Sequence, residues 1–144
     1  MKQVLSKDNI FLNEQAGSKE EAIKKAGEAL VANGYVTSDY VEKMFEREKI
    51  SSTFMGNGIA IPHGTEDAKE EVLHSGISII QIPNGVEYGE DNLAKIVFGI
   101  AGKNNGHLDI LSQIAIVCSE EENVERIINA NDKEELIAIF NEVN

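Results

Sequence analysis

The sequence feature that most constrains the fold is Lys95–Ala101, which carries no polar side chain after its lysine. Successive side chains of a β-strand point to opposite faces, so a strand without polar alternation is covered on both of them. The run is far shorter than the roughly 20 residues that cross a bilayer. We therefore expect it to be a central strand of a sheet that is packed on both faces.

Helical patterns lie on both sides of this run in the sequence. Ser18–Glu21 is a capping box followed by apolar residues at helical spacing, and Gly34 marks the end of that helix. A second helix is predicted after Thr37–Asp39, with Tyr40 in its buried stripe and Arg47 near its end. Three more helices are predicted toward the C-terminus, at about 107–118, at about 120–130 and after the capping box at 132–135.

Shorter extended stretches complete the predicted sheet. Asn9–Leu12 is expected to form a first strand, and Gly76–Ile82 a strand that ends in a turn at Pro83–Gly85. Ser51–Gly58 has the composition of a loop, and Ile59–Ile61 alternates like a short strand. Because strands and helices do not alternate strictly, we expect a mixed sheet covered on both faces, in one domain of 144 residues.

His63 is the residue whose setting most needs a chemical explanation. It follows Pro62, which has no N–H to donate to a sheet, so the imidazole is expected where a strand ends. Gly64 allows another backbone or a ligand to approach without a Cβ in the way, and Thr65 adds a hydroxyl. From spacing alone, His63 is also explained as an ordinary turn residue.

The stretch Gly58–Thr65, Gly-Ile-Ala-Ile-Pro-His-Gly-Thr, resembles the phosphorylation-site motif of the Enzyme IIA components of the bacterial sugar phosphotransferase system. The resemblance is to the mannitol-type branch, which is shared with fructose and nitrogen-type proteins. It extends in order and spacing over nearly the whole chain, through Ala22–Gly34, Tyr35–Val36, Met44–Ile50 and Gly99–His107. It implies an α/β fold, with a single three-layer α/β/α domain over residues 1–144 around a small mixed sheet.

The resemblance implies a phosphotransferase that relays a phosphoryl group. His63 would accept the group from phospho-HPr, on Nε2, and donate it to a cysteine on the IIB domain of a mannitol permease. Transfer to nitrogen requires a neutral imidazole with one exposed lone pair and its other nitrogen held as a donor. Because the transferred group is metaphosphate-like in most analyses, the protein mainly positions it and neutralises its charge.

Two further residues are assigned to the site by the resemblance. His107, near a predicted helix start, would be a second active-site histidine in an auxiliary role, where the helix dipole favours an anion and a neutral imidazole. Arg47 would stabilise the phosphoryl group, because its guanidinium fork can bind two phosphate oxygens. Without the resemblance, His107 also fits a surface position near a cap, and Arg47 a solvated helix end.

Thr65 and the remaining histidine and cysteine carry weaker indications. The Thr65 hydroxyl fits either a donor to a phosphoryl oxygen or a cap of the turn. His74 has no motif around it and is expected at the surface or at a strand entry. Cys118 lies in an apolar stretch, which indicates a small buried side chain, and a single cysteine excludes an internal disulfide.

No metal or cofactor is expected. The three histidines, at 63, 74 and 107, include no pair at helical i, i+3 or i+4 spacing, and no cysteine lies near them in sequence, so a zinc site is not indicated. Gly99–Lys103 faintly resembles a P-loop, but its spacing is short and Asn104 stands where Ser or Thr would hold magnesium. A nucleotide site is therefore not predicted.

Charge and composition bound the partners and the location. The formal net charge of -12 argues against nucleic acid, which needs clustered Lys and Arg, and it favours a basic partner. The N-terminal residues lack the apolar stretch of a signal peptide, and no apolar run is long enough to span a bilayer. A cytoplasmic protein is expected, which meets the membrane only through the permease.

The leading hypothesis is a phosphocarrier for mannitol, and three alternatives stay open. The choice of mannitol over fructose rests on the resemblance of three stretches to the mannitol members, namely Gly34–Val36, Phe45–Lys49 and Lys103–Asn105. None of them has a mechanism tied to the sugar. A nitrogen-type regulatory protein would share the histidine motif but would report its phosphorylation state to other proteins. A metal- or nucleotide-dependent hydrolase that uses His63 and His107 is the remaining hypothesis.

Overall fold

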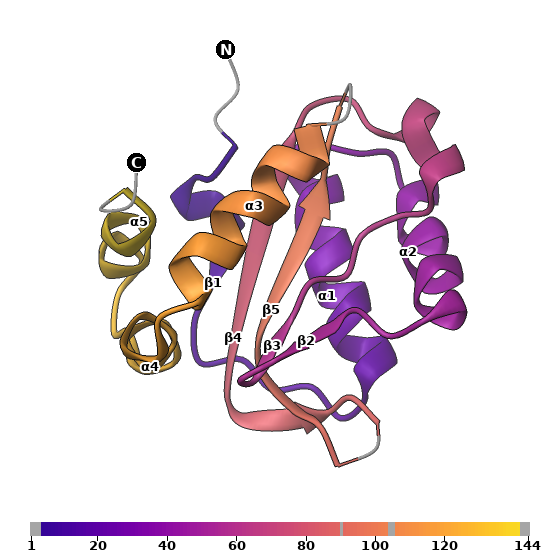
Figure 1. The fold of residues 1–144 in the computed structure, drawn as a ribbon. Coiled ribbons are helices and arrows are strands. Elements are labelled where there is room, and N and C mark those ends of the chain that lie inside the picture. The colour runs from indigo at the N-terminus through magenta and orange to yellow at the C-terminus, as the bar shows by residue number, and fades with distance from the viewer. Residues whose placement is uncertain (1–3, 90, 104–105, 142–144) are drawn as a thin grey trace.

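The structure is a computed structural model that describes residues 4–89, 91–103 and 106–141. Within them the chain forms a five-stranded mixed sheet between two groups of helices, which confirms the α/β/α layers (Figure 1). The strands are β1 (Ile10–Phe11), β2 (Phe54–Gly56), β3 (Ile59–Ala60), β4 (Gly76–Glu87) and β5 (Leu93–Ala101). The helices are α1 (Lys19–Ala32), α2 (Asp39–Ile50), α3 (Gly106–Cys118), α4 (Glu121–Asn129) and α5 (Lys133–Asn141), with short 3-10 helices η1 (Lys7–Asn9) and η2 (Glu66–Glu71).

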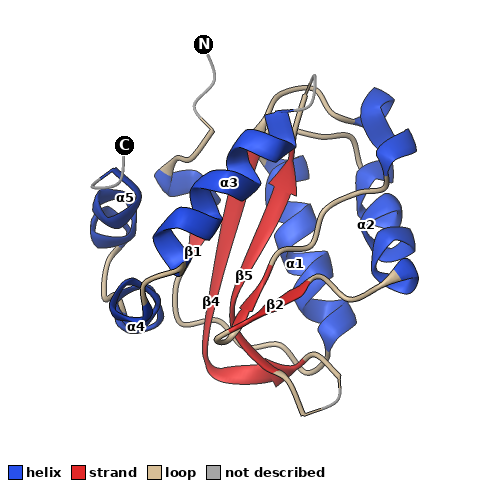
Figure 2. Cartoon of the chain, viewed as in Figure 1, coloured by secondary structure: helices blue, strands red, loops and turns tan. Residues whose placement is uncertain are grey.

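The strand β5 lies at the centre of the sheet, which confirms the prediction from its apolar sequence. The strands β4 and β5 run in opposite directions (Figure 2). The full strand order is β1-β4-β5-β3-β2, with β5 parallel to β3. Val97 and Ala101 pack in the core with α1 and α2, whereas Ile96, Phe98 and Ile100 pack in the core with α3, α4 and α5. Because its side chains alternate between the two faces, both cores depend on this one strand.

The predicted helix ends are also found. Ser18 Oγ accepts from the Glu21 N–H at 3.2 Å, and Glu21 Oε2 accepts from the Gly17 N–H at 2.8 Å. Gly34 follows α1 with a φ of 80°, the left-handed conformation of a glycine just beyond a helix. At the start of α5, Asp132 Oδ1 accepts from a backbone N–H of the first turn at 2.8 Å. These contacts satisfy polar groups that helix ends leave unpaired.

The predicted turn at Pro83–Gly85 is wrong, because β4 continues through it. The pairing with β5 shifts register between Gln81 and Val86, which makes the segment a bulge-like irregularity in the strand. Proline fits there because an interrupted ladder needs no N–H from that residue. The chain reverses after β4 instead, where the Asn92 N–H donates to the Gly89 carbonyl at 2.8 Å.

Part of the predicted loop at Ser51–Gly58 is a strand. β2 pairs antiparallel with β3, and Asn57 and Gly58 connect them. Both connecting residues have positive φ, 53° and 79°, as a type I′ hairpin turn requires. Asn-Gly is a sequence signal for this turn, but the polar and glycine-rich residues around it gave the segment the composition of a loop.

The connection from β5 leads into α3, which begins at Gly106, close to the predicted start. Asn104 and Asn105, which belong to the motifs weighed from the sequence, lie outside the described residues. Within the described part of the chain, no helix is long and apolar enough to cross a membrane.

Candidate functional site

His63 lies beyond the end of the parallel pair β3 and β5, and an isolated bridge links it to β5. The Ile100 N–H donates to the Pro62 carbonyl at 3.0 Å, and His63 forms an isolated bridge with Ile100. β3 ends at Ala60, so His63 lies where a strand ends, as the sequence predicts. Proline lacks only the donor, and the Pro62 carbonyl still accepts from β5. The imidazole is presented where β5 leads toward α3.

The His63 ring is oriented by a hydrogen bond to its own segment. Nδ1 lies 2.8 Å from the Ile61 carbonyl oxygen. A carbonyl only accepts, so Nδ1 carries the proton in this contact, and in the neutral ring the lone pair is on Nε2. This is the tautomer that a phosphoryl acceptor at Nε2 requires.

Gly64 is required by an aromatic ring rather than by a backbone or a ligand. Tyr40 of α2 is 4% exposed, and its Cε1 would lie 2.6 Å from a Cβ at Gly64. The Tyr40 hydroxyl accepts from the Gly64 N–H at 2.9 Å and donates to the Ile100 carbonyl at 2.7 Å. Burial raises the pKa of Tyr40 to about 12, so the hydroxyl keeps its proton near neutral pH. The sequence indicated Tyr40 only as part of a buried helix stripe.

A cavity of about 390 Å³ brings three of the four candidate residues together. His63 and Thr65 reach it from the segment after β3, and Arg47 from the end of α2. The rest of the lining comes from α2, η2 and its flanks, the residue after β5 and the start of α3, namely Tyr40, Gly64, Glu66, Ala68, Lys69, Val72, Gly102, Leu108 and Leu111. Lys69 is exposed and adds a positive charge to this lining that no sequence motif indicated.

The fourth candidate, His107, is in the first turn of α3. Its neighbour Leu108 lines the cavity, as does Gly102 before the helix. The start of α3 therefore borders the site, where the positive end of the helix dipole favours negative charge. The side chain of His107 lies outside the described residues, so its auxiliary role stays a prediction.

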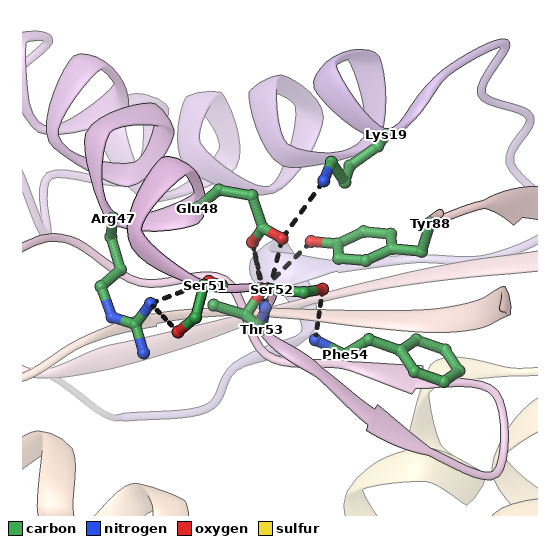
Figure 3. A network of polar contacts seen from close by, with 8 residues as sticks. All are labelled: Lys19, Arg47, Glu48, Ser51, Ser52, Thr53, Phe54 and Tyr88. Carbon is green, nitrogen blue, oxygen red and sulfur yellow. Dashed lines mark hydrogen bonds and ion pairs between the residues drawn. The ribbon is translucent and has the colours of Figure 1, made fainter. Parts of the chain in front are cut away.

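Arg47 is partly buried rather than a fully solvated helix end. Its Nη1 donates to the Ser51 carbonyl at 2.9 Å and lies 3.3 Å from Ser51 Oγ (Figure 3). The contact orients the guanidinium on the segment after α2, while the residue also lines the cavity beside His63. Its role in binding a phosphoryl group stays a prediction.

The segment after α2, where Ser51 accepts from Arg47, is held in place by the buried carboxylate of Glu48. Glu48 is 8% exposed, and both of its oxygens accept from the Thr53 N–H at 3.2 Å. Oε1 also accepts from the Thr53 hydroxyl at 2.6 Å, and Oε2 lies 3.5 Å from Lys19 Nζ (Figure 3). The Tyr88 hydroxyl lies 3.2 Å from Thr53 Oγ1. We call this group of contacts the Glu48 network. It holds together the end of α2 and the segment that leads into β2.

Thr65 donates its hydroxyl proton to the Asp67 carboxylate. Asp67 Oδ2 also lies 3.6 Å from Lys43 Nζ. The hydrogen bond from Thr65, and after it the charge of Lys43, lower the pKa of Asp67. Thr65 precedes η2 but makes no side-chain cap hydrogen bond, so the capping role is not found. A phosphoryl oxygen would have to compete with Asp67 for the hydroxyl proton, and the donor role stays a prediction.

Comparison with known proteins gives the family of this chain. Residues 3–143 match the family model for the phosphoenolpyruvate-dependent sugar phosphotransferase system, EIIA 2. The chain belongs to this family. The mannitol-specific phosphotransferase enzyme IIA component of Bacillus subtilis (strain 168) is 76% identical over 142 residues, which cover 99% of each chain.

Solved structures show the same EIIA 2 fold. The enzyme IIA mannitol of Escherichia coli, solved in complex with phosphorylated enzyme IIB mannitol, has a TM-score of 0.91 at 40% identity, covering 96% of this chain and 97% of that one. The nitrogen regulatory protein IIA-Ntr of Neisseria meningitidis has a TM-score of 0.81 at 28% identity, with 95% and 96% covered. The fold is thus shared by this mannitol protein and this nitrogen protein, and the identity is higher to the mannitol one.

Cys118 is buried and His74 is exposed, as the sequence predicted. Cys118 is buried in the core formed with α3, α4 and α5, where burial raises the pKa of its thiol to about 11. His74 is exposed and does not line the cavity. Among the residues that the structure describes, no three His, Cys, Asp or Glu side chains are grouped as a metal site would need.

Proposed function

We propose that this protein is a mannitol phosphocarrier, which accepts a phosphoryl group from phospho-HPr on Nε2 of His63 and donates it to the cysteine of the IIB domain of a mannitol permease. The observation that carries the proposal is the contact of Nδ1 with the Ile61 carbonyl. It leaves the lone pair of the neutral ring on Nε2, in a residue that lines the cavity. The identity to mannitol-specific proteins supports the choice of sugar.

The two transfer steps balance without moving a proton on His63. In the first step the bond between phosphorus and HPr breaks and a P–Nε2 bond forms, while Nδ1 keeps its proton. The ring then carries positive charge, which the Ile61 carbonyl stabilises as a hydrogen-bond acceptor. In the second step the P–Nε2 bond breaks, its electron pair returns to Nε2, and the IIB sulfur, reacting as the thiolate, takes the phosphoryl group. The same tautomer is restored after each cycle.

The proposed role of Arg47 is to neutralise the phosphoryl oxygens. Its Nη1 is anchored on Ser51, and a guanidinium offers donors in a fixed fork with a constant charge. Lys69 adds a second cation to the lining of the cavity. We propose that His107 helps to orient the phosphoryl group, and that Thr65 contributes only when its hydroxyl leaves the Asp67 carboxylate.

A regulatory protein of the nitrogen type is the main alternative, because it has the same fold. The higher identity to the mannitol proteins of Bacillus subtilis and Escherichia coli named above favours the carrier. Family membership favours phosphoryl relay over a hydrolase and over a role with nucleic acid. As part of the proposal, residues 1–144 act as one domain in the cytoplasm and meet the membrane through the permease.

Transfer of labelled phosphate tests this function. Labelled phospho-HPr is mixed with the protein, and purified IIB domains of the mannitol and fructose types are then added in separate reactions. We expect the label to reach the mannitol IIB domain faster than the fructose one. Label that stays on the protein with every IIB domain would contradict the carrier function and favour the regulatory alternative.

A further inference from the structure

The hydroxyl of Tyr40 has no part in the transfer steps, yet its two hydrogen bonds meet beside His63. Tyr40 is buried in α2, and the hydroxyl accepts from the Gly64 N–H at 2.9 Å. It donates to the Ile100 carbonyl at 2.7 Å. A buried tyrosine whose hydroxyl joins two backbone groups far apart in sequence does more than fill space in the core.

These bonds tie both neighbours of His63 to one residue of β5. On one side, the Pro62 carbonyl accepts directly from the Ile100 N–H at 3.0 Å. On the other side, the Gly64 N–H reaches the Ile100 carbonyl through the Tyr40 hydroxyl. His63 is therefore bracketed by a closed set of bonds that begins and ends on Ile100.

We propose that Tyr40 is a positioning residue for His63. The Tyr40 hydroxyl holds the turn at Pro62–Gly64, so that Nδ1 of His63 stays on the Ile61 carbonyl. This role rests on the proposed function of His63 as the acceptor. The ring of Tyr40 explains why residue 64 is glycine, since a Cβ there would lie 2.6 Å from Cε1. The hydroxyl is not needed for this ring contact, because phenylalanine would fill the same space. Its role is therefore in the two hydrogen bonds. Without the hydroxyl, an N–H and a carbonyl beside His63 lose their partner, and the turn must move to satisfy them.

A second buried tyrosine offers a matched control. Tyr88 is 1% exposed, and its hydroxyl lies 3.2 Å from Thr53 Oγ1 in the Glu48 network. Tyr88→Phe therefore removes the same atom from a similarly buried side chain, but one that has no bond to the residues beside His63. The comparison with Tyr40→Phe separates a local effect on His63 from the general cost of losing a buried hydroxyl.

The test combines the tautomer of His63 with the transfer rate. The NMR shifts of the two imidazole nitrogens, measured on unphosphorylated protein, report which nitrogen carries the proton. In Tyr40→Phe we expect the two nitrogens to lose their distinct shifts, and transfer from phospho-HPr to slow about tenfold, which equals about 1.4 kcal/mol in the barrier. In Tyr88→Phe we expect the wild-type tautomer, even if its melting temperature falls as much as that of Tyr40→Phe. The control is read on the tautomer alone, because Tyr88 belongs to the network that holds the segment anchoring Arg47.

Two results would overturn the positioning role. One is a Tyr40→Phe protein with the wild-type tautomer and rate, and the other is an equal change of the tautomer in Tyr88→Phe. Hydrogen exchange of the Gly64 amide in the wild-type protein needs no variant: we expect it to be slow, and exchange at the rate of an exposed amide would also overturn the role. Phosphate found on a residue other than His63 would refute the proposed acceptor, whereas the tautomer comparison on unphosphorylated protein would still decide the positioning role.

Discussion

The two sides of the cavity hold their principal residues by different means. The His63 ring donates to the neutral Ile61 carbonyl, and the next residue donates to the neutral Tyr40 hydroxyl. Arg47 is held through a segment that the buried, charged carboxylate of Glu48 ties down. One side is a set of neutral hydrogen bonds, and the other contains a buried anion.

This difference matches the chemistry proposed for each residue. A carboxylate next to an imidazole raises its pKa and favours a proton on both nitrogens, which would remove the lone pair needed on Nε2. A guanidinium keeps its charge at any physiological pH, so a nearby carboxylate does not change its protonation. The buried anion of Glu48 thus lies on the side where the charge is constant, whereas the His63 ring is oriented by a neutral carbonyl.

Removing the buried anion has the largest expected effect. Glu48→Ala leaves the Thr53 N–H and hydroxyl without their acceptor, so we expect the free energy of unfolding to fall by about 2–4 kcal/mol. Denaturant unfolding measures this loss. Glu46→Ala is the matched control, because its carboxylate is exposed on the same helix, and we expect a change within about 0.5 kcal/mol. Equal losses in the two variants would show that the Glu48 network does not stabilise the fold.

A methyl group at Gly64 tests the neutral side. In Gly64→Ala the Tyr40 ring or the turn must shift, so we expect a loss of about 1–3 kcal/mol in the free energy of unfolding and slower transfer from phospho-HPr. Gly17→Ala is the control, because its Cβ would approach only the end of the flexible Glu21 side chain. Thermal unfolding and rapid-quench transfer measure both quantities, and a Gly64→Ala protein that matches wild type in both would refute the close contact.

Removing the constant charge tests the other side without a large cost in stability. Arg47→Ala should slow transfer from phospho-HPr and to the IIB domain by about tenfold or more, because charge-assisted hydrogen bonds to phosphate are strong. Arg47→Lys should recover only part of the rate, since an ammonium keeps the charge but lacks the fork. Lys49→Ala, an exposed cation at the same helix end, serves as the control. Unaltered rates in Arg47→Ala would remove Arg47 from the site.

The smallest expected effect concerns the turn that follows His63. The Thr65 hydroxyl is the main cause of the lowered pKa of Asp67, so Thr65→Ala should raise that pKa toward the ordinary aspartate value. A lowered carboxyl pKa stabilises the fold above the ordinary aspartate pKa, and this stabilisation is lost as the pH falls through the lowered value. The variant should therefore lose a small part of its stability above that range. An NMR titration of Asp67 measures the shift, and an unchanged pKa in the variant would contradict the contact.

The fold could be predicted wherever the signal was local. The apolar run at Lys95–Ala101 indicated a central strand by itself, since no other segment is needed to infer two covered faces. Pro83–Gly85 could not be assigned in this way, because proline, asparagine and glycine suit a bulge as well as a turn. The partner strand decides between them, since β5 extends far enough to pair with Val86 and Glu87.

The site shows the same limit. His63 and Arg47 were found through a sequence motif, and the structure places both on one cavity. Tyr40 was missed because its hydroxyl meets Gly64 and Ile100, which are 24 and 60 positions away, and no local pattern reports such contacts. Glu48 was missed for the same reason, because a glutamate near a helix end is usually solvated.

The identity of the phosphorylated residue is the central question for this protein. Mass spectrometry of wild type, His63→Ala and His74→Ala after reaction with phospho-HPr tests it, with His74 as an exposed histidine outside the cavity. We predict one phosphoryl group on His63, acid-labile and alkali-stable as a phosphoramidate is, with His74→Ala equal to wild type and no phosphorylation of His63→Ala. Full phosphorylation of His63→Ala by phospho-HPr would contradict the account.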